Sequence, residues 1–144
     1  MAVTATLRWT DGHRLVASDQ HGVTIQVDSA AEGYEPRGFK PVALLLASLG
    51  ACVAYDMVEI LRKQRQSFTA IAIDITGEQA PEAPWAFQRI HLTFTITGQG
   101  LSRERAERAV ALAESKYCAV SATIGPDTQI TTEVVVLEDA APRA

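Results

Sequence analysis

The amino-acid sequence predicts an α+β fold, in which antiparallel strands pack against one long helix and one shorter helix. Three observations lead to this prediction: β-branched, alternating runs near the N-terminus, one long apolar run at 41–66, and two further alternating runs at 68–76 and 87–97. The expected order of elements is β-β-β-α-β-β-α-β. At 144 residues the chain is expected to form a single domain over 1–144, with a core that needs neither disulfides nor metal.

Composition and charge exclude several classes of partner. Apolar residues make up 47% of the chain and charged residues 21%, as is typical of a soluble globular protein. The net charge of −4 comes without a basic stripe, so no nucleic-acid partner is expected. The first 17 residues lack the apolar core of a signal peptide, and no stretch approaches the roughly 20 uninterrupted apolar residues of a membrane span. We therefore expect a cytoplasmic protein with no membrane partner.

The N-terminal region is expected to form a three-stranded antiparallel meander. Two turn signals, Asp11-Gly12 and His21-Gly22, separate runs of alternating and β-branched residues. The expected strands are 2–9, 14–19 and 23–27. The segment that follows, 29–40, is rich in Gly, Pro and charge and is expected to be an exposed loop.

The run at 41–66 predicts a long, mostly buried helix. Pro41 suits the first helical turn, and apolar side chains occupy more than one face up to Glu59, before a cationic C-terminal end. A helix over this whole run would span roughly 39 Å, which is long for a domain of this size. We therefore expect the helix to end early, to kink, or to bury part of its surface on a partner chain. Gly50 is a candidate point of close approach by another backbone.

The C-terminal half is expected to add two strands, a helix and a last strand. The strands at 68–76 and 87–97 alternate clearly, and a Pro-punctuated loop connects them. Ser102 suits the N-cap of a helix that runs to about Tyr117 and places Cys118 at its end. A short apolar segment, a last strand and a frayed tail are expected at 119–124, at 130–137 and from Glu138.

Cys52 lies in the long helix and is one of only two cysteines. A nucleophilic thiol must reach the thiolate form, which burial opposes and a nearby cation favours. Asp56 lies one turn further along the same helical face, and its negative charge would raise the thiol pKa, so activation requires a cation from elsewhere. The candidate cations that precede the helix are His13, Arg14, Arg37 and Lys40. Arg14 is expected on a strand and held rigidly, whereas Arg37 is expected on a loop and able to swing.

Cys118 follows the C-terminal end of a helical pattern, where the helix dipole disfavours a thiolate. That position suits a resolving thiol better than an attacking one. The alternative is that both cysteines are small buried hydrophobic residues without chemistry, as free cysteines commonly are. Sequence spacing does not place the two sulfurs within the Cα separation of about 4.4–6.8 Å that a disulfide needs. A disulfide between them would be reversible rather than part of a structural framework.

No metal or cofactor motif accompanies the cysteines. The three histidines, His13, His21 and His91, are scattered among predicted strands without metal-ligand spacing. The sequence contains neither a phosphate-binding glycine loop nor a GxSxG nucleophile motif. We therefore expect no metal site and no bound cofactor.

Two stretches of the chain resemble the OsmC/Ohr family of hydroperoxide-reducing proteins. They are PVALLLASLGACVAYDMVEIL around Cys52 and AESKYCAV around Cys118, and the predicted order of elements matches the family along nearly the whole chain. The continuation DMVEILRKQRQ is most similar to the YhfA-like branch of the family. The resemblance implies an OsmC-like fold and an intertwined homodimer, with the long helices packed centrally and the active sites at the interface.

The resemblance also implies a mechanism. Cys52 would attack an organic hydroperoxide and become a sulfenic acid, and Cys118 would condense with it to a disulfide. A dithiol reductant, of the lipoyl type or similar, would then reset the pair by exchange. Neither metal nor flavin is implied.

The chain departs from the family pattern at the start of the long helix. In the peroxidases of the family a glutamate follows the helix-starting proline and pairs with an arginine, whereas this chain has Val42. Glu35 or Asp56 would be a substitute carboxylate, and either Arg14 or Arg37 would be the arginine. The alternative function is that of an OsmC-fold dimer without peroxidase activity, which binds a small apolar ligand at the interface or has a structural role.

Overall fold

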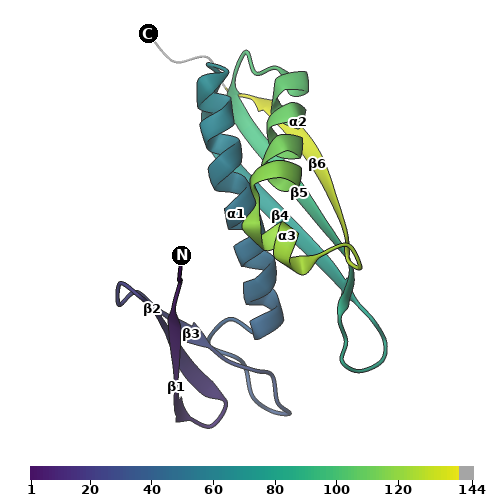
Figure 1. Cartoon of the computed structure of the whole chain (residues 1–144). Helices are drawn as coiled ribbons and strands as arrows, with labels where there is room; N and C mark the ends of the chain where they lie inside the picture. The colour runs from purple at the N-terminus through teal and green to yellow at the C-terminus, as the bar shows by residue number, and fades with distance from the viewer. Residues whose placement is uncertain (140–144) are drawn as a thin grey trace. The chain divides into compact units, whose positions relative to one another are not determined.

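The computed structural model describes residues 1–139 and forms two compact units, Met1–Leu45 and the part of the chain from Leu46 onward (Figure 1). The first unit holds three strands, and the second holds three more strands and the C-terminal helices. The long helix begins in the first unit and continues into the second. The α+β class is confirmed, and the predicted order of elements gains one additional short helix before the last strand.

The first unit contains the expected antiparallel meander. Its strands are β1 (Ala5–Asp11), β2 (Arg14–Asp19) and β3 (Thr24–Val27), which pair in that order. All seven residues of β1 are exposed. Leu7 is 56% exposed and Trp9 is 69% exposed, so this strand presents large apolar side chains to solvent. Exposed apolar surface of this kind marks a place where a partner can pack.

The segment 29–40 closes back onto β3 at its base. The Asp28 N–H donates to the Phe39 carbonyl over 2.9 Å, and the Phe39 N–H donates to the Gln26 carbonyl over 3.0 Å. Gly38 lies at this crossing, where a Cβ atom would come within 2.6 Å of the Gln26 oxygen. Because only glycine permits that approach, the segment is anchored against the strand although most of its residues are exposed.

Helix α1 (Pro41–Lys63) is the long helix that the apolar run predicts, and it ends earlier than residue 66. The chain leaves the helix through Arg65, whose φ of +58° does not continue a right-handed helix. Every fourth side chain along one face is fully buried, and these residues are Leu49, Val53, Met57 and Leu61. Apolar side chains on other faces remain outside the core, and Tyr55 is strongly exposed.

By length and composition α1 is also long and apolar enough to cross a membrane. Its buried face nevertheless belongs to the hydrophobic core of the second unit, where it packs against a sheet. Only 28% of the most apolar 18-residue window of α1 is buried, so the prediction of a mostly buried helix is wrong for the chain taken alone.

The second unit is built on a sheet of β4 (Ser67–Gln79), β5 (Phe87–Gln99) and β6 (Gln129–Glu138), in that order. β4 and β5 are antiparallel, as predicted. β6 runs parallel to β5, so the prediction of antiparallel strands is wrong for this pair. The helical connection between them returns the chain to the end of the sheet at which β5 begins, as a parallel pair of strands requires. β6 extends through Glu138, where the sequence predicts fraying, and the remainder of that tail, 140–144, lies outside the described residues.

The C-terminal helical stretch consists of three parts. Helix α2 (Arg103–Leu112) begins at the predicted N-cap, where Ser102 Oγ accepts a hydrogen bond from the Arg105 N–H over 3.2 Å. A π-helical turn, Ala113–Tyr117, continues it to the predicted end. The apolar segment after Cys118 then forms helix α3 (Ala119–Ile124).

Both α1 and α2 pack on the same face of the second sheet (Figure 1). The face of β5 that the alternation predicts is fully buried, and its residues are Ile90, Leu92, Phe94 and Ile96. α2 contributes small buried side chains, which are Ala106, Ala109 and Val110. This core holds the helix that carries Cys52 against the segment that carries Cys118.

Gly50 marks a close approach on α1, but a side chain makes it rather than another backbone. A Cβ atom at this position would lie 2.4 Å from Cδ1 of Ile75 on β4. The missing side chain therefore leaves a depression on the helix that the branched side chain of Ile75 fills. The expectation of backbone contact is wrong because β4 faces α1 with its side chains.

Candidate active site

The structure brings the two cysteines together in the second unit. Cys118 is 3% exposed and belongs to the hydrophobic core, and Cys52 is half-buried and packs against that core. Cys52 packs against the core cluster that contains Cys118, so the two side chains are neighbours, and both are free thiols. A reversible disulfide requires two cysteines from distant parts of the sequence to be brought together in the fold, as this core does.

Cys118 lies where one helical segment ends and the next begins. It follows the π-turn with an extended backbone, φ −78° and ψ 107°, and it is the N-cap residue of α3. Its Sγ accepts a hydrogen bond from the backbone N–H of Ser121 over 3.3 Å. The sulfur is thus held in one position by the backbone of the helix that follows it.

Burial raises the pKa of Cys118 to about 11, from an ordinary value of 9.0. The hydrogen bond from the Ser121 N–H acts in the opposite direction, and the contact with Cys52 raises the pKa further. Cys118 is therefore a protonated thiol at neutral pH. A protonated, buried thiol is a poor first nucleophile. The half-buried Cys52 is the sulfur that a substrate reaches more easily.

Sequence reasoning missed two polar residues next to Cys118. Ser121 Oγ donates a hydrogen bond to Glu114 Oε1 over 2.5 Å, and the pair is partly buried. A regular helix register gives no reason to expect this contact, because the π-turn that contains Glu114 winds differently from an α-helix. One feature of the sequence could have revealed Ser121. It lies three residues after Cys118 at the start of a helix, which is the spacing of an N-cap residue and the N–H that it binds.

Arg14 lies on β2, as predicted, and forms a bidentate ion pair with Asp11. Its Nε and Nη2 atoms donate to Oδ1 and Oδ2 of Asp11, each over 2.6 Å. The hydrogen bond from Arg14 holds the pKa of Asp11 below its ordinary value. The positive charge of the Arg14 guanidinium is therefore already paired with a carboxylate of the first unit.

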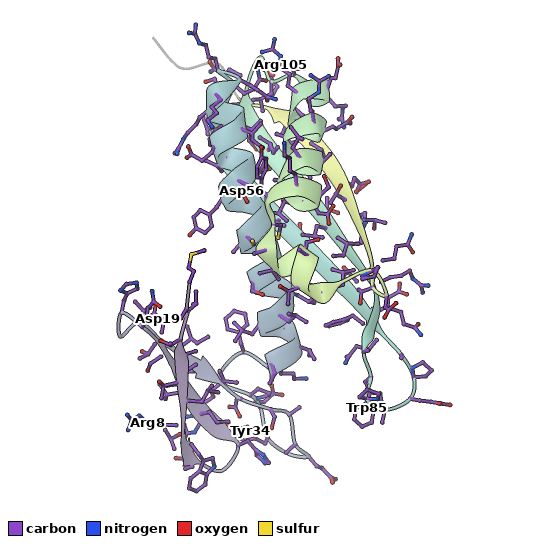
Figure 2. The ribbon with its side chains drawn as sticks, in the orientation of Figure 1. Arg8, Asp19, Tyr34, Asp56, Trp85 and Arg105 are labelled. Carbon is purple, nitrogen blue, oxygen red and sulfur yellow. The ribbon has the colours of Figure 1, made fainter. Side chains whose placement is uncertain are left out.

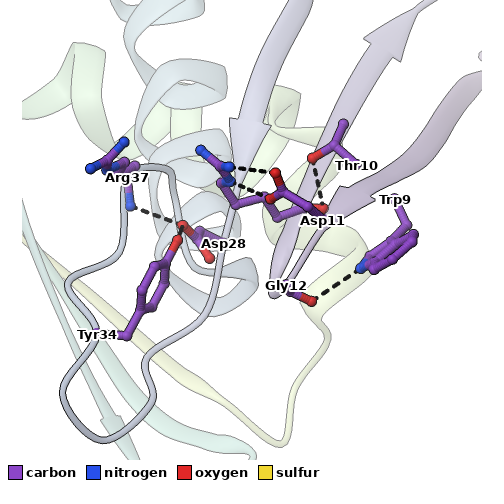
Figure 3. A network of polar contacts seen from close by, with 8 residues as sticks. Trp9, Thr10, Asp11, Gly12, Asp28, Tyr34 and Arg37 are labelled. Carbon is purple, nitrogen blue, oxygen red and sulfur yellow. Dashed lines mark hydrogen bonds and ion pairs between the residues drawn. The ribbon is translucent and has the colours of Figure 1, made fainter.

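A buried carboxylate organises the loop that carries Arg37 (Figure 3). Asp28 is 2% exposed and accepts hydrogen bonds from the Ser29 N–H at 2.8 Å, the Tyr34 hydroxyl at 2.5 Å and the Arg37 N–H at 2.9 Å. Burial raises the pKa of Asp28, but the hydrogen bonds from Arg37, Tyr34 and Ser29 outweigh it, so the net shift is downward. The His13 ring lies 5.6 Å from the Tyr34 ring. Asp28 thus fixes the backbone of Arg37 through the N–H of that residue.

The side chain of Arg37 lines two cavities of the first unit. One has a volume of about 310 Å³ and is also lined by His13, Arg14 and Tyr34. The other has a volume of about 810 Å³ and is lined by Ile25, Gln26, Pro36, Arg37, Gly38, Phe39, Lys40 and Ala43. Within residues 1–139 no carboxylate forms an ion pair with the Arg37 guanidinium. Of the two predicted arginines, Arg37 is the one whose charge is available.

The positions discussed as carboxylate sites differ in environment. Val42 is exposed at the start of α1, and Glu35 is exposed on the loop before it. Asp56 projects from α1 and is half-buried (Figure 2). It lines a groove of about 490 Å³ beside β4, together with Tyr55 and Arg62. Among the described residues no group of three or more His, Cys, Asp or Glu side chains is placed to hold a metal ion.

Comparison with known sequences finds one family for this chain. A family model described as OsmC-like protein matches residues 31–133. Protein YhfA of Escherichia coli (strain K12) is 32% identical over 127 residues, and the match covers 88% of this chain and 92% of that protein.

Solved structures have the same fold. A hypothetical protein from Aquifex aeolicus VF5 matches with a TM-score of 0.86 and 24% identity, over 97% of this chain and 99% of that chain. An organic hydroperoxide resistance protein from Legionella pneumophila matches with a TM-score of 0.67 and 19% identity, over 94% of this chain and 98% of that chain. At these identities the two matches establish the fold alone.

Proposed function

The chain belongs to the OsmC-like protein family, and from this membership we propose that it is a thiol-dependent peroxidase that reduces organic hydroperoxides. The single observation that carries the proposal is that Cys52 packs against the core cluster that contains Cys118, so the only two cysteines of the chain are neighbours. The proposal of an organic hydroperoxide as substrate is supported by the name of the Legionella pneumophila protein with the same fold, an organic hydroperoxide resistance protein.

The proposed reaction has three steps. The Cys52 thiolate attacks one peroxide oxygen, the O–O bond breaks, and the alcohol leaves while Cys52 becomes a sulfenic acid. The Cys118 sulfur then attacks the Cys52 sulfur, an S–S bond forms, the S–O bond breaks, and water leaves. A dithiol, of the lipoyl type or similar, supplies two electrons by exchange and returns both cysteines to thiols.

Of the two arginines that the sequence offers as the activating cation, we propose Arg37, because no carboxylate within residues 1–139 pairs with its guanidinium. A guanidinium stabilises a thiolate and polarises a peroxide oxygen, and it can do so only if no carboxylate neutralises it. Arg14 is held by Asp11, whereas Arg37 is exposed on a loop that Asp28 anchors. In the peroxidases of the family a glutamate pairs with the arginine, and this chain has Val42 at that position. The orientation of Arg37 therefore depends on the loop that carries it.

The proposal includes a homodimer. β1 is exposed along its whole length, with Leu7 and Trp9 in solvent, and α1 has apolar surface outside the core. A second copy of the chain is the partner that supplies matching apolar surfaces, because each copy exposes the same strand and helix. We expect the dimer to bury these surfaces together.

A second candidate function is binding of a small apolar ligand without peroxidase activity. The cavity of about 810 Å³ in the first unit favours it, because its lining includes Ile25, Pro36 and Phe39. The absence of the family glutamate, with Val42 in its place, points in the same direction. In this case the cysteines would be core residues, and the dimer would serve to form the ligand site.

Turnover of an organic hydroperoxide separates the two functions. Wild type is expected to consume cumene hydroperoxide and tert-butyl hydroperoxide in the presence of a dithiol, and Cys52→Ser is expected to be inactive. Cys118→Ser should react once with peroxide and then turn over slowly, because the sulfenic acid has no partner. A wild type without turnover, or activity that survives Cys52→Ser, would exclude the peroxidase and leave the ligand-binding function.

A further inference from the structure

Hydrogen bonds connect a carboxylate to the sulfur of Cys118. The Ser121 hydroxyl donates to Glu114 Oε1 over 2.5 Å, and the backbone N–H of Ser121 donates to Cys118 Sγ over 3.3 Å. Ser121 therefore contacts the carboxylate with its side chain and the sulfur with its backbone. Glu114 comes from the π-turn before Cys118 and Ser121 from α3 after it, so the contact joins the segments on either side of the cysteine.

This arrangement restricts where the sulfur can lie. α3 has only six residues, and a helix of that length has little stability of its own. The hydrogen bond to Glu114 ties the first turn of α3 to the preceding turn, and this fixes the direction of the Ser121 N–H. Without the tie, the first turn of α3 can rotate or fray, and the N–H no longer points at the sulfur.

We propose that Glu114 and Ser121 are positioning residues for the resolving thiol, which fix the Ser121 N–H on Cys118 Sγ and hold the sulfur against Cys52. The proposal rests on the proposed function, because the step concerned is the attack of Cys118 on the Cys52 sulfenic acid. As the S–S bond forms and the S–O bond breaks, the Cys118 proton leaves with the hydroxyl as water. The Ser121 N–H stabilises the negative charge that the attacking sulfur carries when its proton departs.

Rapid mixing with one equivalent of cumene hydroperoxide separates the two steps. Trapping with dimedone reports the Cys52 sulfenic acid, and loss of both thiols reports the disulfide. In Ser121→Ala and Glu114→Ala, the first step should keep its wild-type rate, and disulfide closure should slow by about tenfold, the effect of one well-placed hydrogen bond. The sulfenic acid should then accumulate and trap in higher yield than in wild type.

Conservative variants distinguish positioning from simple loss of packing. Ser121→Thr keeps a hydroxyl and Glu114→Gln keeps an acceptor oxygen, so both should close the disulfide at close to the wild-type rate. Ser115→Ala is the matched control, because the Ser115 hydroxyl also lies in the π-turn but donates to the Ala111 carbonyl, over 2.6 Å, instead of reaching α3. It should leave both steps unchanged.

The proposal is overturned if Ser121→Ala closes the disulfide at the wild-type rate, or if Ser115→Ala slows it equally. Ser121→Ala removes a single atom, so its result decides between the outcomes even if Glu114→Ala does not fold.

Oxidation by diamide is a second experiment that needs no peroxide, because one thiolate adds to the N=N bond of diamide and the second thiol displaces the hydrazine to form the disulfide. If Cys52 does not react with peroxide, the proposed function fails, and closure after diamide still tests Glu114 and Ser121 with the same tenfold expectation.

Discussion

The two cysteines have different surroundings, and the proposed mechanism gives them different roles. Cys118 is buried and hydrogen-bonded to the Ser121 N–H, whereas Cys52 is half-buried on α1. The sequence predicts that a thiolate is disfavoured at Cys118 because a helix ends there, and the structure gives a different physical reason for the raised pKa. A second helix starts at Cys118, so burial rather than the dipole of the preceding helix sets its pKa. The contact between the sulfurs could not be predicted, because it depends on how α1 and α3 pack.

The raised pKa of Cys118 predicts a loss of stability in alkaline solution. The unfolded chain releases the Cys118 proton near pH 9.0, and the folded chain retains it to about pH 11. The folded state thus binds more protons between these values, so its stability is complete below pH 9 and falls as the pH rises through 11. Urea unfolding from pH 8 to pH 11 should show a decrease of about 2 kcal/mol that Cys118→Ala lacks. Equal slopes for the two proteins would contradict the buried thiol.

The difference between the two arginines predicts unequal effects on activity. Arg37→Leu should lower kcat/KM for cumene hydroperoxide by about 100-fold, because it removes the charge available to the thiolate and the peroxide. Arg14→Leu should lower it by less than about threefold, since its charge is already paired with Asp11. Steady-state kinetics with a dithiol measures both. A large loss for Arg14→Leu with a small one for Arg37→Leu would transfer the role to Arg14.

At the scale of elements, the sequence predicts what depends on local pattern. The alternation in β4 and β5, the N-cap at Ser102 and the apolar run of α1 all form the expected elements. The π-turn and the parallel direction of β6 are missed, because both depend on how the α2–α3 connection crosses the sheet. Local pattern therefore defines the framework of the site, while the geometry around Cys118 arises from tertiary packing.

The depression at Gly50 gives a prediction about the contact between α1 and β4. Gly50→Ala would place a Cβ atom 2.4 Å from Ile75 Cδ1, so it should lower the free energy of unfolding by about 1–2 kcal/mol despite the better helix propensity of alanine. Ile75→Val removes Cδ1, and the double variant should recover part of that loss. A urea-based double-mutant cycle measures the coupling. An additive double variant would mean that the two residues do not touch.

At the scale of the whole molecule, the exposed strand β1 is the feature that bears on assembly. In globular proteins strands that expose large apolar side chains along one element are usually covered by a partner. β1 exposes Leu7 and Trp9, and this surface, rather than the helix length alone, now supports the dimer predicted from sequence. Sequence could not identify it, because an alternating strand pattern does not reveal whether its apolar face is covered within the same chain.

A charge on that surface should prevent assembly. Trp9→Asp and Leu7→Asp are expected to convert a dimer to a monomer in analytical ultracentrifugation, because each buries an unpaired carboxylate in the interface. Arg8→Asp is the control, since this residue points to the opposite face of β1 and already carries a charge. A wild type that sediments as a monomer would refute the dimer.

The most direct test of the central claim is the state of the two sulfurs after a single reaction with peroxide. Wild-type protein is treated with one equivalent of cumene hydroperoxide, blocked with an alkylating agent, digested without reductant and analysed by mass spectrometry. The account predicts a peptide pair joined through Cys52 and Cys118, which dithiol treatment returns to two free thiols. Two alkylated thiols, or an oxidised Cys52 beside an alkylated Cys118, would contradict it.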